Sequence, residues 1–264
     1  MDTVVLTGAT SGLGAGLTRE LADRADHLIL HGRDTGRLDA VAATARDRGA
    51  RVTTLTADLG DPLEVRGLCA RVRELAGRLD LVINNAAVGG GADPEHRETN
   101  RYGTELRMAA NVIAPHLIAS ELWPVMPPNG RIVQIGSAGQ APLEPSDLDF
   151  TRGYQGVEAY LRSKLALIMD TIDLAARGIW VNVVHPADRM PTTMVRESRL
   201  VPHATIDDGL LPVLRVALDT ELAGITGRYF DRFELAEPHP QAADPAVRQV
   251  LQRWIGDQLA LAGV

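Results

Sequence analysis

Lysine is almost absent from this sequence: Lys164 is the single lysine, and the other 26 basic residues are arginines. A guanidinium group cannot replace an ammonium group where a compact, movable charge is needed. A chain that otherwise uses only arginine therefore indicates a specific requirement for lysine at position 164. Aromatic residues make up only 4% of the chain, which predicts a core built mainly from alanine, leucine and valine.

A second cysteine, long apolar runs and excess positive charge are also missing. Cys69 is the single cysteine, so no internal disulfide can form, and a reducing cytoplasm is the expected compartment. No apolar run is long enough to cross a membrane, and a strand pattern that begins at residue 3 fits no signal peptide. The net charge of −7 argues against non-specific nucleic-acid binding. We therefore expect no nucleic acid, no membrane and no metal among the partners.

A glycine-rich turn stands between the first predicted strand and the first predicted helix. Residues 3–7 form a short apolar run, and Leu17 and Leu21 continue a helical pattern after the glycines. Glycines let the backbone approach a pyrophosphate, while the helix N-terminus offers free N–H groups and a positive dipole. This strand–turn–helix arrangement predicts a dinucleotide site. The residues expected to contact the cofactor here are Gly8, Thr10, Ser11, Gly12, Leu13 and Gly14.

The end of the second predicted strand, residues 27–31, indicates which dinucleotide binds. An NAD site carries a carboxylate near this point to bind the ribose, whereas an arginine accommodates the extra phosphate of NADP. Here the strand runs into Gly32 and Arg33, so the sequence favours NADP(H). Asp34 leaves NAD open as the alternative, although it is better explained as the N-cap of the next helix. An aspartate introduced at position 32 is expected to reverse the preference.

Lys164 follows Tyr160 by four residues, so the two side chains share one face of a predicted helix. Leu161, Leu165 and Ile168 belong to an apolar stripe beside that face. An adjacent cation favours the phenolate, so Lys164 is expected to lower the pKa of Tyr160 and to make it a general acid or base near neutral pH. The alternative is a tyrosine and a lysine on an ordinary solvated helix face.

The glycine spacing, Gly-x3-Gly-x-Gly, together with Tyr-x3-Lys resembles the short-chain dehydrogenase/reductase family in its single-domain branch. Residues 84–87, Asn-Asn-Ala-Ala, are similar to the family's Asn-Asn-Ala-Gly turn, and Ser137 follows the fifth predicted strand. The 22 residues between Ser137 and Tyr160 exceed the family's usual gap, which resembles the retinol-dehydrogenase-like and protochlorophyllide-reductase-like subgroup. Thr-Gly-Arg-Tyr-Phe at residues 226–230, followed by a helix, is similar to actinobacterial members.

This resemblance implies an α/β fold: a doubly wound, mostly parallel seven-stranded sheet with helices on both faces, known as a Rossmann fold. It also implies hydride transfer between NADP(H) and a carbonyl or alcohol carbon. Tyr160 would be the general acid in reduction, Lys164 would lower its pKa and bind the nicotinamide ribose, and Ser137 would hold the carbonyl oxygen. Asn111, on a helix predicted over residues 102–122, would hold a water that links Lys164 to solvent. The remaining implied cofactor contacts are Asp58, Leu59, Asn85, Ala86, Ala87, Pro186 and Thr192.

On this reading residues 1–264 form a single dinucleotide-binding domain. An insert at about residues 138–155 is expected at the rim of the substrate pocket, and a mobile lid at about residues 190–204. The candidate pocket residues, which indicate a partly apolar ketone or aldehyde, are Tyr154, Met190 and Met194. Assembly as a homodimer or homotetramer is left open. Two other functions also stay open: a catalytically idle NADP-binding sensor, and a dehydratase or epimerase on the same fold.

Overall fold

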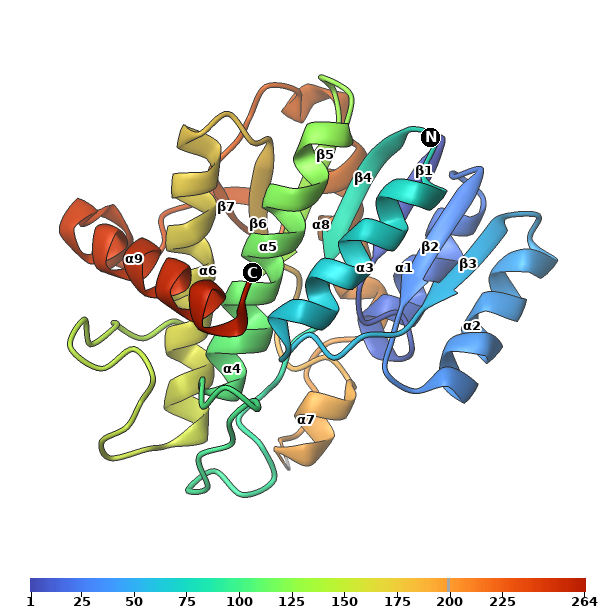
Figure 1. Ribbon diagram of the computed structural model, residues 1–264. Coiled ribbons are helices and arrows are strands. Elements are labelled where there is room, and N and C mark those ends of the chain that lie inside the picture. Colours follow the sequence, from blue (N-terminus) through green and yellow to red (C-terminus); the bar gives the residue numbers. More distant parts are fainter. Residues whose placement is uncertain (199) are drawn as a thin grey trace.

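The computed structural model describes residues 1–198 and 200–264, and the strands in these residues form one central sheet (Figure 1). The eight strands of the described chain are β1 Thr3–Leu6, β2 His27–His31, β3 Arg51–Leu55, β4 Leu79–Asn84, β5 Arg131–Ile135, β6 Val181–His185, β7 Tyr229–Asp231 and β8 Glu234–Ala236. They lie in the order β3-β2-β1-β4-β5-β6-β7-β8, and each neighbouring pair except β7 and β8 is parallel. The order reverses between β1 and β4, and ligands bind at such switch points in open sheets.

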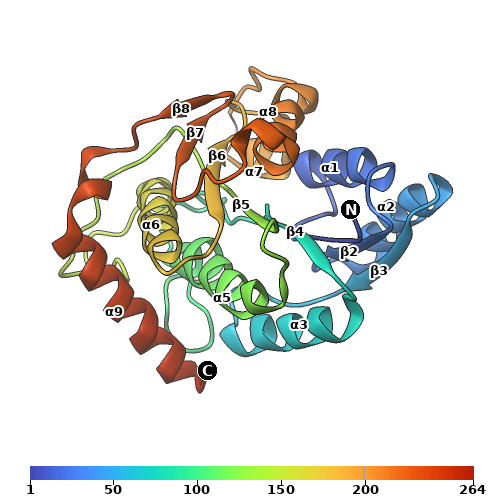
Figure 2. The same ribbon diagram turned by 90° about the horizontal axis from the view of Figure 1, so that it is seen from above.

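Helices cover both faces of the sheet. The α-helices are α1 Gly12–Ala22, α2 Thr35–Asp47, α3 Pro62–Leu75, α4 Leu106–Met108, α5 Ala114–Leu122, α6 Gly156–Ala176, α7 Thr193–Glu197, α8 Ile206–Leu218 and α9 Pro245–Ala262. A π-helix, η1 Ala109–Ile113, lies between α4 and α5, and short 3₁₀ turns are η2 Trp123–Val125, η3 Thr220–Leu222 and η4 Pro240–Ala243. Viewed from above, α1, α2 and α8 lie on one face, α3, α5 and α6 lie on the other, and α9 packs outside α6 (Figure 2).

Apolar side chains fill the space between the sheet and each helix layer. Leu30 and Val213 belong to the cluster beneath α1 and α8, whereas Val82 and Ile118 belong to the cluster beneath α3 and α5. All four residues of β1 are buried, as expected for a central parallel strand covered on both faces. A third cluster, which includes Phe150, joins α6 and α9 to the insert that precedes α6. Aliphatic residues dominate these clusters, as the low aromatic content predicts.

Side-chain caps fix where several helices begin. The Oδ1 atom of Asp34 accepts a hydrogen bond from the backbone N–H of Arg37 at 3.0 Å, which confirms Asp34 as the N-cap of α2. Thr205 and Asp208 form a reciprocal capping box at the start of α8. Because such signals depend only on neighbouring residues, the start of α2 at Asp34 could be predicted from the sequence.

Two expectations about the elements were wrong. The seven expected strands are present as β1 to β7, but β8 adds an antiparallel edge strand after a tight turn in which Arg232 has a φ of +55°. The helix expected over residues 102–122 begins only at Leu106, because the chain turns sharply at Gly103, where φ is +86°. That helical region also contains the π-helix η1, centred on Asn111. Such π turns occur often at functional sites.

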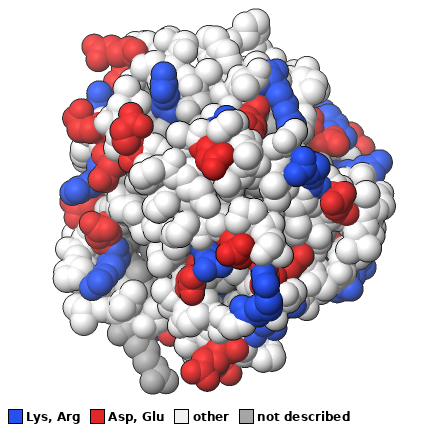
Figure 3. Space-filling view, turned by 90° about the vertical axis from the view of Figure 1, so that its left-hand side faces the viewer, with Lys and Arg blue, Asp and Glu red and all other residues white. Residues whose placement is uncertain are grey.

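The surface carries charges of both signs. Acidic and basic side chains are interspersed over the face on which α9 lies, the left-hand side of Figure 1, as the space-filling view shows (Figure 3). Throughout the part of the chain that the structure describes, no helix combines the length and the apolar character needed to span a bilayer.

Candidate active site

The glycine loop between β1 and α1 is packed so closely that side chains are excluded from its key positions. Gly8 has a φ of +66°, and a Cβ atom there would lie 2.8 Å from the Cα of Ala86. A Cβ atom on Gly14 would lie only 2.1 Å from the carbonyl oxygen of Gly8. Gly12 has a φ of +52° and lies against Thr192, whose Cγ2 would be 3.0 Å from an added Cβ. The loop therefore presents bare backbone at the start of α1.

The N-terminus of α1 has the character of an anion site. Ser11 is the N-cap residue, but its side chain makes no capping hydrogen bond with any described residue. The first N–H groups of α1 and the positive end of its dipole therefore lack a side-chain acceptor. Thr10 is half-buried in the loop, whereas Leu13 turns into the core, so Leu13 can offer a cofactor only its backbone. Phosphate groups bind at helix N-termini of this kind.

Two residues that the sequence analysis did not single out, Thr7 and His31, hold the loop in place. Asn85 donates from Nδ2 to the carbonyl oxygens of Thr7 and Gly8 at 2.9 and 3.0 Å, and its own N–H donates to the Thr7 hydroxyl at 3.0 Å. His31 is buried on β2, with Nδ1 3.4 Å from the N–H of Gly8 and Nε2 3.0 Å from the carbonyl oxygen of Ala57. Burial lowers the pKa of His31 and so favours a neutral ring, which accepts at Nδ1 and donates at Nε2.

The ends of β2 and β3 border the glycine loop. Arg33 is exposed immediately after the buried Gly32. Asp34 is turned toward α2, where its carboxylate serves as the cap described above. At the end of β3, Asp58 is exposed, whereas Leu59 is buried with 8% of its surface accessible. The guanidinium of Arg33 is therefore better placed than the carboxylate of Asp34 to meet a group that arrives at the end of β2.

Ser137, Tyr160 and Lys164 come together at the carboxyl end of β5. Lys164 is 2% exposed, and its Nζ donates to the carbonyl oxygen of Ile135 at 2.9 Å. The same Nζ lies 5.7 Å from the centre of the Tyr160 ring. The hydroxyl of Ser137, just beyond the strand, accepts from the N–H of Gly139 at 3.1 Å. Lys164 is thus buried against the sheet and Tyr160 is half-buried beside it, which excludes the alternative of a solvated helix face for the lysine.

Burial controls the pKa values of this pair. It raises the pKa of Tyr160, and side-chain hydrogen bonding with Ser137 offsets only part of that effect. Burial also lowers the pKa of Lys164 from 10.5 to about 8. The expectation that Lys164 lowers the pKa of Tyr160 below its usual value is therefore wrong for the protein by itself. Removal of the phenol from water is the largest cause of the rise in the pKa of Tyr160.

Asn111 joins the loop after β4 to α6. Its Oδ1 accepts from the N–H of Val88 at 2.8 Å, and its Nδ2 donates to the carbonyl oxygen of Val88 at 2.9 Å. The Nδ2 also donates to the Oγ of Ser163 at 3.0 Å, and that hydroxyl donates to the carbonyl oxygen of Tyr160 at 2.7 Å. One lone pair of Oδ1 remains for a water. The π-helix η1 places this side chain beside the residue that precedes Lys164.

The segment after β6 lies over the loop after β4. Pro186 is buried directly beyond β6, and the Thr192 hydroxyl caps α7 by accepting from the N–H of Val195 at 3.4 Å. Met194 covers the loop after β4, which includes Ala87, because its Cγ would lie 2.5 Å from a Cβ added to Gly89. Thr192 and Met194 therefore lie beside the two loops that border the candidate cofactor site.

Met190, one of the expected pocket residues, packs into the core under α8. It is 8% exposed and belongs to the core cluster under α8, where its Sδ would lie 2.3 Å from a Cβ added to Gly209. The preceding Arg189 has a φ of +45°, which turns the chain inward. The lid expected at residues 190–204 contains the short helix α7 and so is more regular than its sequence suggested, and residue 199 of that segment lies outside the described residues.

Tyr154 is likewise not a free pocket residue. Its hydroxyl donates to Oε1 of Glu105 at 3.0 Å and accepts from Nη1 of Arg107 at 2.6 Å. Arg107 is fully buried and also donates from Nε to the carbonyl oxygen of Gly89 at 2.8 Å. Burial raises the pKa of Tyr154. The phenol thus closes a buried ionic cluster beneath the loop after β4, and the sequence gives no sign of this because Arg107 lies far from Tyr154 along the chain.

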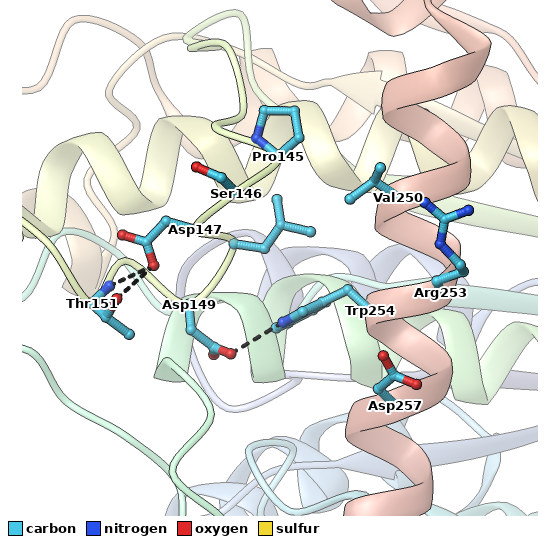
Figure 4. Close-up of a pocket in the computed structure, with 10 residues that line it drawn as sticks. Pro145, Ser146, Asp147, Asp149, Thr151, Val250, Arg253, Trp254 and Asp257 are labelled. Carbon is cyan, nitrogen blue, oxygen red and sulfur yellow. Dashed lines mark hydrogen bonds between the residues drawn. The ribbon is translucent and has the colours of Figure 1, made fainter.

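The insert expected at about residues 138–155 is irregular and is anchored to the C-terminal helix α9. Asp149 accepts from Nε1 of Trp254 at 3.1 Å and from the N–H of Glu105 at 3.1 Å. Leu148 and Phe150 on either side are buried. A hollow of about 450 Å³ lies between the insert and α9 (Figure 4). The side chains around it that Figure 4 labels are Pro145, Ser146, Asp147, Asp149, Thr151, Val250, Arg253, Trp254 and Asp257.

Comparison with known proteins supports the resemblance seen in the motifs. Residues 2–201 match the model of the short chain dehydrogenase family. Human retinol dehydrogenase 13 is 28% identical over 289 aligned residues, which cover 99% of this chain and 85% of the relative. A crystal structure of an uncharacterised protein from Mycobacterium paratuberculosis has a TM-score of 0.77 at 26% identity, covering 98% of this chain and 93% of that one.

A second solved structure carries a cofactor. It is a short chain dehydrogenase from Burkholderia cenocepacia J2315 in complex with NADP, with a TM-score of 0.68 at 28% identity, covering 88% of this chain and 96% of that one. The similarity to these two structures covers 98% and 88% of this chain. With the family match over residues 2–201, it shows that the chain belongs to the short-chain dehydrogenase family of oxidoreductases.

Proposed function

We propose that this protein is an NADP(H)-dependent oxidoreductase that transfers a hydride between the nicotinamide and the carbonyl or alcohol carbon of a small, partly apolar molecule. The observation that carries the proposal is the buried Lys164 beside the half-buried Tyr160 and Ser137, at the carboxyl end of β5. A buried lysine without a carboxylate partner costs stability, so a functional role is the better explanation for the chain's single lysine.

The residues around the glycine loop fit a dinucleotide. The bare backbone at Gly8, Gly12 and Gly14 and the open N-terminus of α1 suit the pyrophosphate. Arg33 suits the 2′-phosphate of NADP, because Asp34 is occupied as the cap of α2. The bound cofactor would supply the hydride, and the protein would supply position and a proton. The complex of the Burkholderia cenocepacia relative with NADP supports this choice.

In the direction of reduction Tyr160 would donate a proton to the carbonyl oxygen of the substrate. Burial raises the pKa of Tyr160, so the phenol is protonated near neutral pH, which is the form that a proton donor requires. Ser137 would donate a hydrogen bond to the same oxygen and stabilise its developing negative charge. Lys164 would place a positive charge beside the phenolate that forms. Asn111 would hold a water on its remaining lone pair and link Lys164 to solvent.

The substrate would lie between the loop after β4 and the segment after β6. We assign residues 190–204 as a lid, in which Met194 contributes an apolar surface over Gly89. The insert at residues 138–155 would form part of the rim, and its anchoring by Asp149 to α9 suits a fixed wall. On this proposal residues 1–264 act as one domain. The similarity to retinol dehydrogenase 13 supports a substrate with apolar character.

The experiment that tests this proposal combines cofactor binding with turnover. Dissociation constants for NADPH and NADH are measured by the quenching of protein fluorescence, and NADPH absorbance is then followed against a panel of ketones and aldehydes. We expect tighter binding of NADPH and its oxidation by at least one apolar carbonyl compound, with the matching alcohol as product. Tight binding without turnover on any member would favour an idle NADP-binding sensor, and tighter binding of NADH would overturn the choice of cofactor.

A further inference from the structure

Position 32, at the end of β2, requires a glycine because there is no space for a side chain, and not because of its backbone conformation. Its φ is not in the left-handed region, where glycine is normally required. A Cβ atom at this position would nevertheless lie 2.3 Å from Cγ2 of Thr10, well inside any real contact distance. It would also lie 3.4 Å from Cδ1 of Leu38, which is 1% exposed. The methyl group of Thr10 therefore occupies the space in which a side chain at position 32 would begin.

The glycine loop and the end of β2 cannot easily move apart to admit such a side chain. The glycine loop is tied to β2, because the N–H of Ala9 donates to the carbonyl oxygen of His31 at 2.9 Å. The N–H of Gly32 donates in turn to the carbonyl oxygen of Leu55 on β3 at 3.3 Å. Thr10 is β-branched, so its χ1 angle has few alternatives. The clash is thus built into the packing of the loop against the sheet.

This packing keeps an acidic side chain away from the place where a site that binds NAD requires one. A site that prefers NAD carries a carboxylate near the end of this strand to bind the ribose hydroxyls. At position 32 the methyl group of Thr10 excludes it, and at position 34 the carboxylate is diverted to α2, where Oδ2 also pairs with Nε of Arg37 at 3.3 Å. Both nearby positions for an acidic group are therefore unavailable, while Arg33 remains exposed.

We propose that Thr10 is a specificity-determining residue of the cofactor site: its methyl group keeps position 32 free of any side chain and so reserves the end of β2 for a 2′-phosphate. This inference rests on the proposed function and adds a steric element to the charge of Arg33. On this proposal Gly32→Asp alone would not reverse the cofactor preference, in contrast to the expectation from sequence. The new side chain would displace the glycine loop before its carboxylate could reach the ribose.

A double-mutant cycle tests the inference, with Thr10→Ser, Gly32→Asp and the combined variant. Serine lacks the methyl group and keeps the hydroxyl. Dissociation constants for NADPH and NADH are measured at one fixed ionic strength, and circular dichroism verifies folding. We expect Gly32→Asp alone to weaken both cofactors by tenfold or more, Thr10→Ser alone to retain the preference for NADPH, and the combined variant to bind NADH at least tenfold more tightly than NADPH.

Gly32→Ala supplies a control without charge. In the native background it should lower the melting temperature and weaken both cofactors, and in the Thr10→Ser background both effects should largely disappear. The inference is overturned if Gly32→Asp alone produces a preference for NADH, or if the Thr10→Ser background changes none of the effects of substitution at position 32. If the native protein binds neither cofactor, the proposed function fails and the selective role of Thr10 fails with it, whereas the melting temperatures still decide the steric claim.

Discussion

Replacing Lys164 with methionine is expected to stabilise the protein at neutral pH while it abolishes activity. Burial lowers the pKa of Lys164 from 10.5 to about 8, so at pH 7 the folded protein carries a buried ammonium group. A pKa lowered to this extent corresponds to roughly 3 kcal/mol of unfavourable free energy for the charged form. Loss of the hydrogen bond from Nζ to Ile135 would cost about 1 kcal/mol. Lys164→Met should therefore raise the free energy of unfolding at pH 7 by about 2 kcal/mol.

The sign of the pH dependence follows from the same pKa values. Below pH 8 the lysine is charged in both the folded and the unfolded chain, so the unfavourable free energy is fully present. Between pH 8 and 10.5 the folded protein loses this proton before the unfolded chain does, and the stability of the native protein rises with pH. By pH 9.5 the unfavourable free energy of the buried lysine falls to roughly half. The gain in the free energy of unfolding from Lys164→Met should then shrink to well below about 1 kcal/mol.

Urea unfolding followed by circular dichroism at pH 7 and pH 9.5 measures these free energies. Leu165→Met is the matched control, because Leu165 is fully buried on the same helix and does not titrate. The difference in the free energy of unfolding between Leu165→Met and the native protein should be the same at both pH values. If Lys164→Met is less stable than the native protein at pH 7, or if its advantage is unchanged at pH 9.5, burial does not set the pKa of Lys164 as argued.

Three further predictions concern the site. Lys164→Arg should lose most activity despite its conserved charge, because a planar guanidinium cannot replace a compact donor in the buried space beside Tyr160; turnover near the native value would refute this. Arg33→Ala should weaken NADPH by roughly 10- to 150-fold and leave NADH nearly unchanged, as titrations of both cofactors would reveal. Backbone amides of the described part of residues 190–204 should exchange hydrogen faster than those of β1 and β4 when no substrate is present, and equally slow exchange would argue against a lid.

The parts of the site that could be predicted from sequence are those fixed by local chemistry. The glycine spacing predicts the loop because the close contacts of Gly8 and Gly14 leave no room for a side chain. Asp34 was predicted as a cap because capping depends on residues within one helical turn. The spacing of Tyr160 and Lys164 predicts a shared helix face, and α6 provides it.

The features that were missed depend on distant parts of the chain. The pKa of Tyr160 rises where a fall was expected, because the fold removes the phenol from water, and sequence spacing does not report burial. Met190 packs under α8 because Gly209, remote in sequence, leaves space for its sulfur atom. Tyr154 is held by Arg107 from another element, and the clash between Thr10 and Gly32 joins two different turns.

The turnover of Tyr160→Phe tests the central claim most directly. With a carbonyl substrate identified on the native protein, kcat is measured for Tyr160→Phe and for Tyr154→Phe, which removes the same atom outside the reacting centre. We predict that Tyr160→Phe binds NADPH normally but loses kcat by a factor on the order of 100 or more, the scale expected for a general acid, while Tyr154→Phe stays within several-fold of the native value. Near-native turnover by Tyr160→Phe, above all with loss of activity in Tyr154→Phe, would contradict the account.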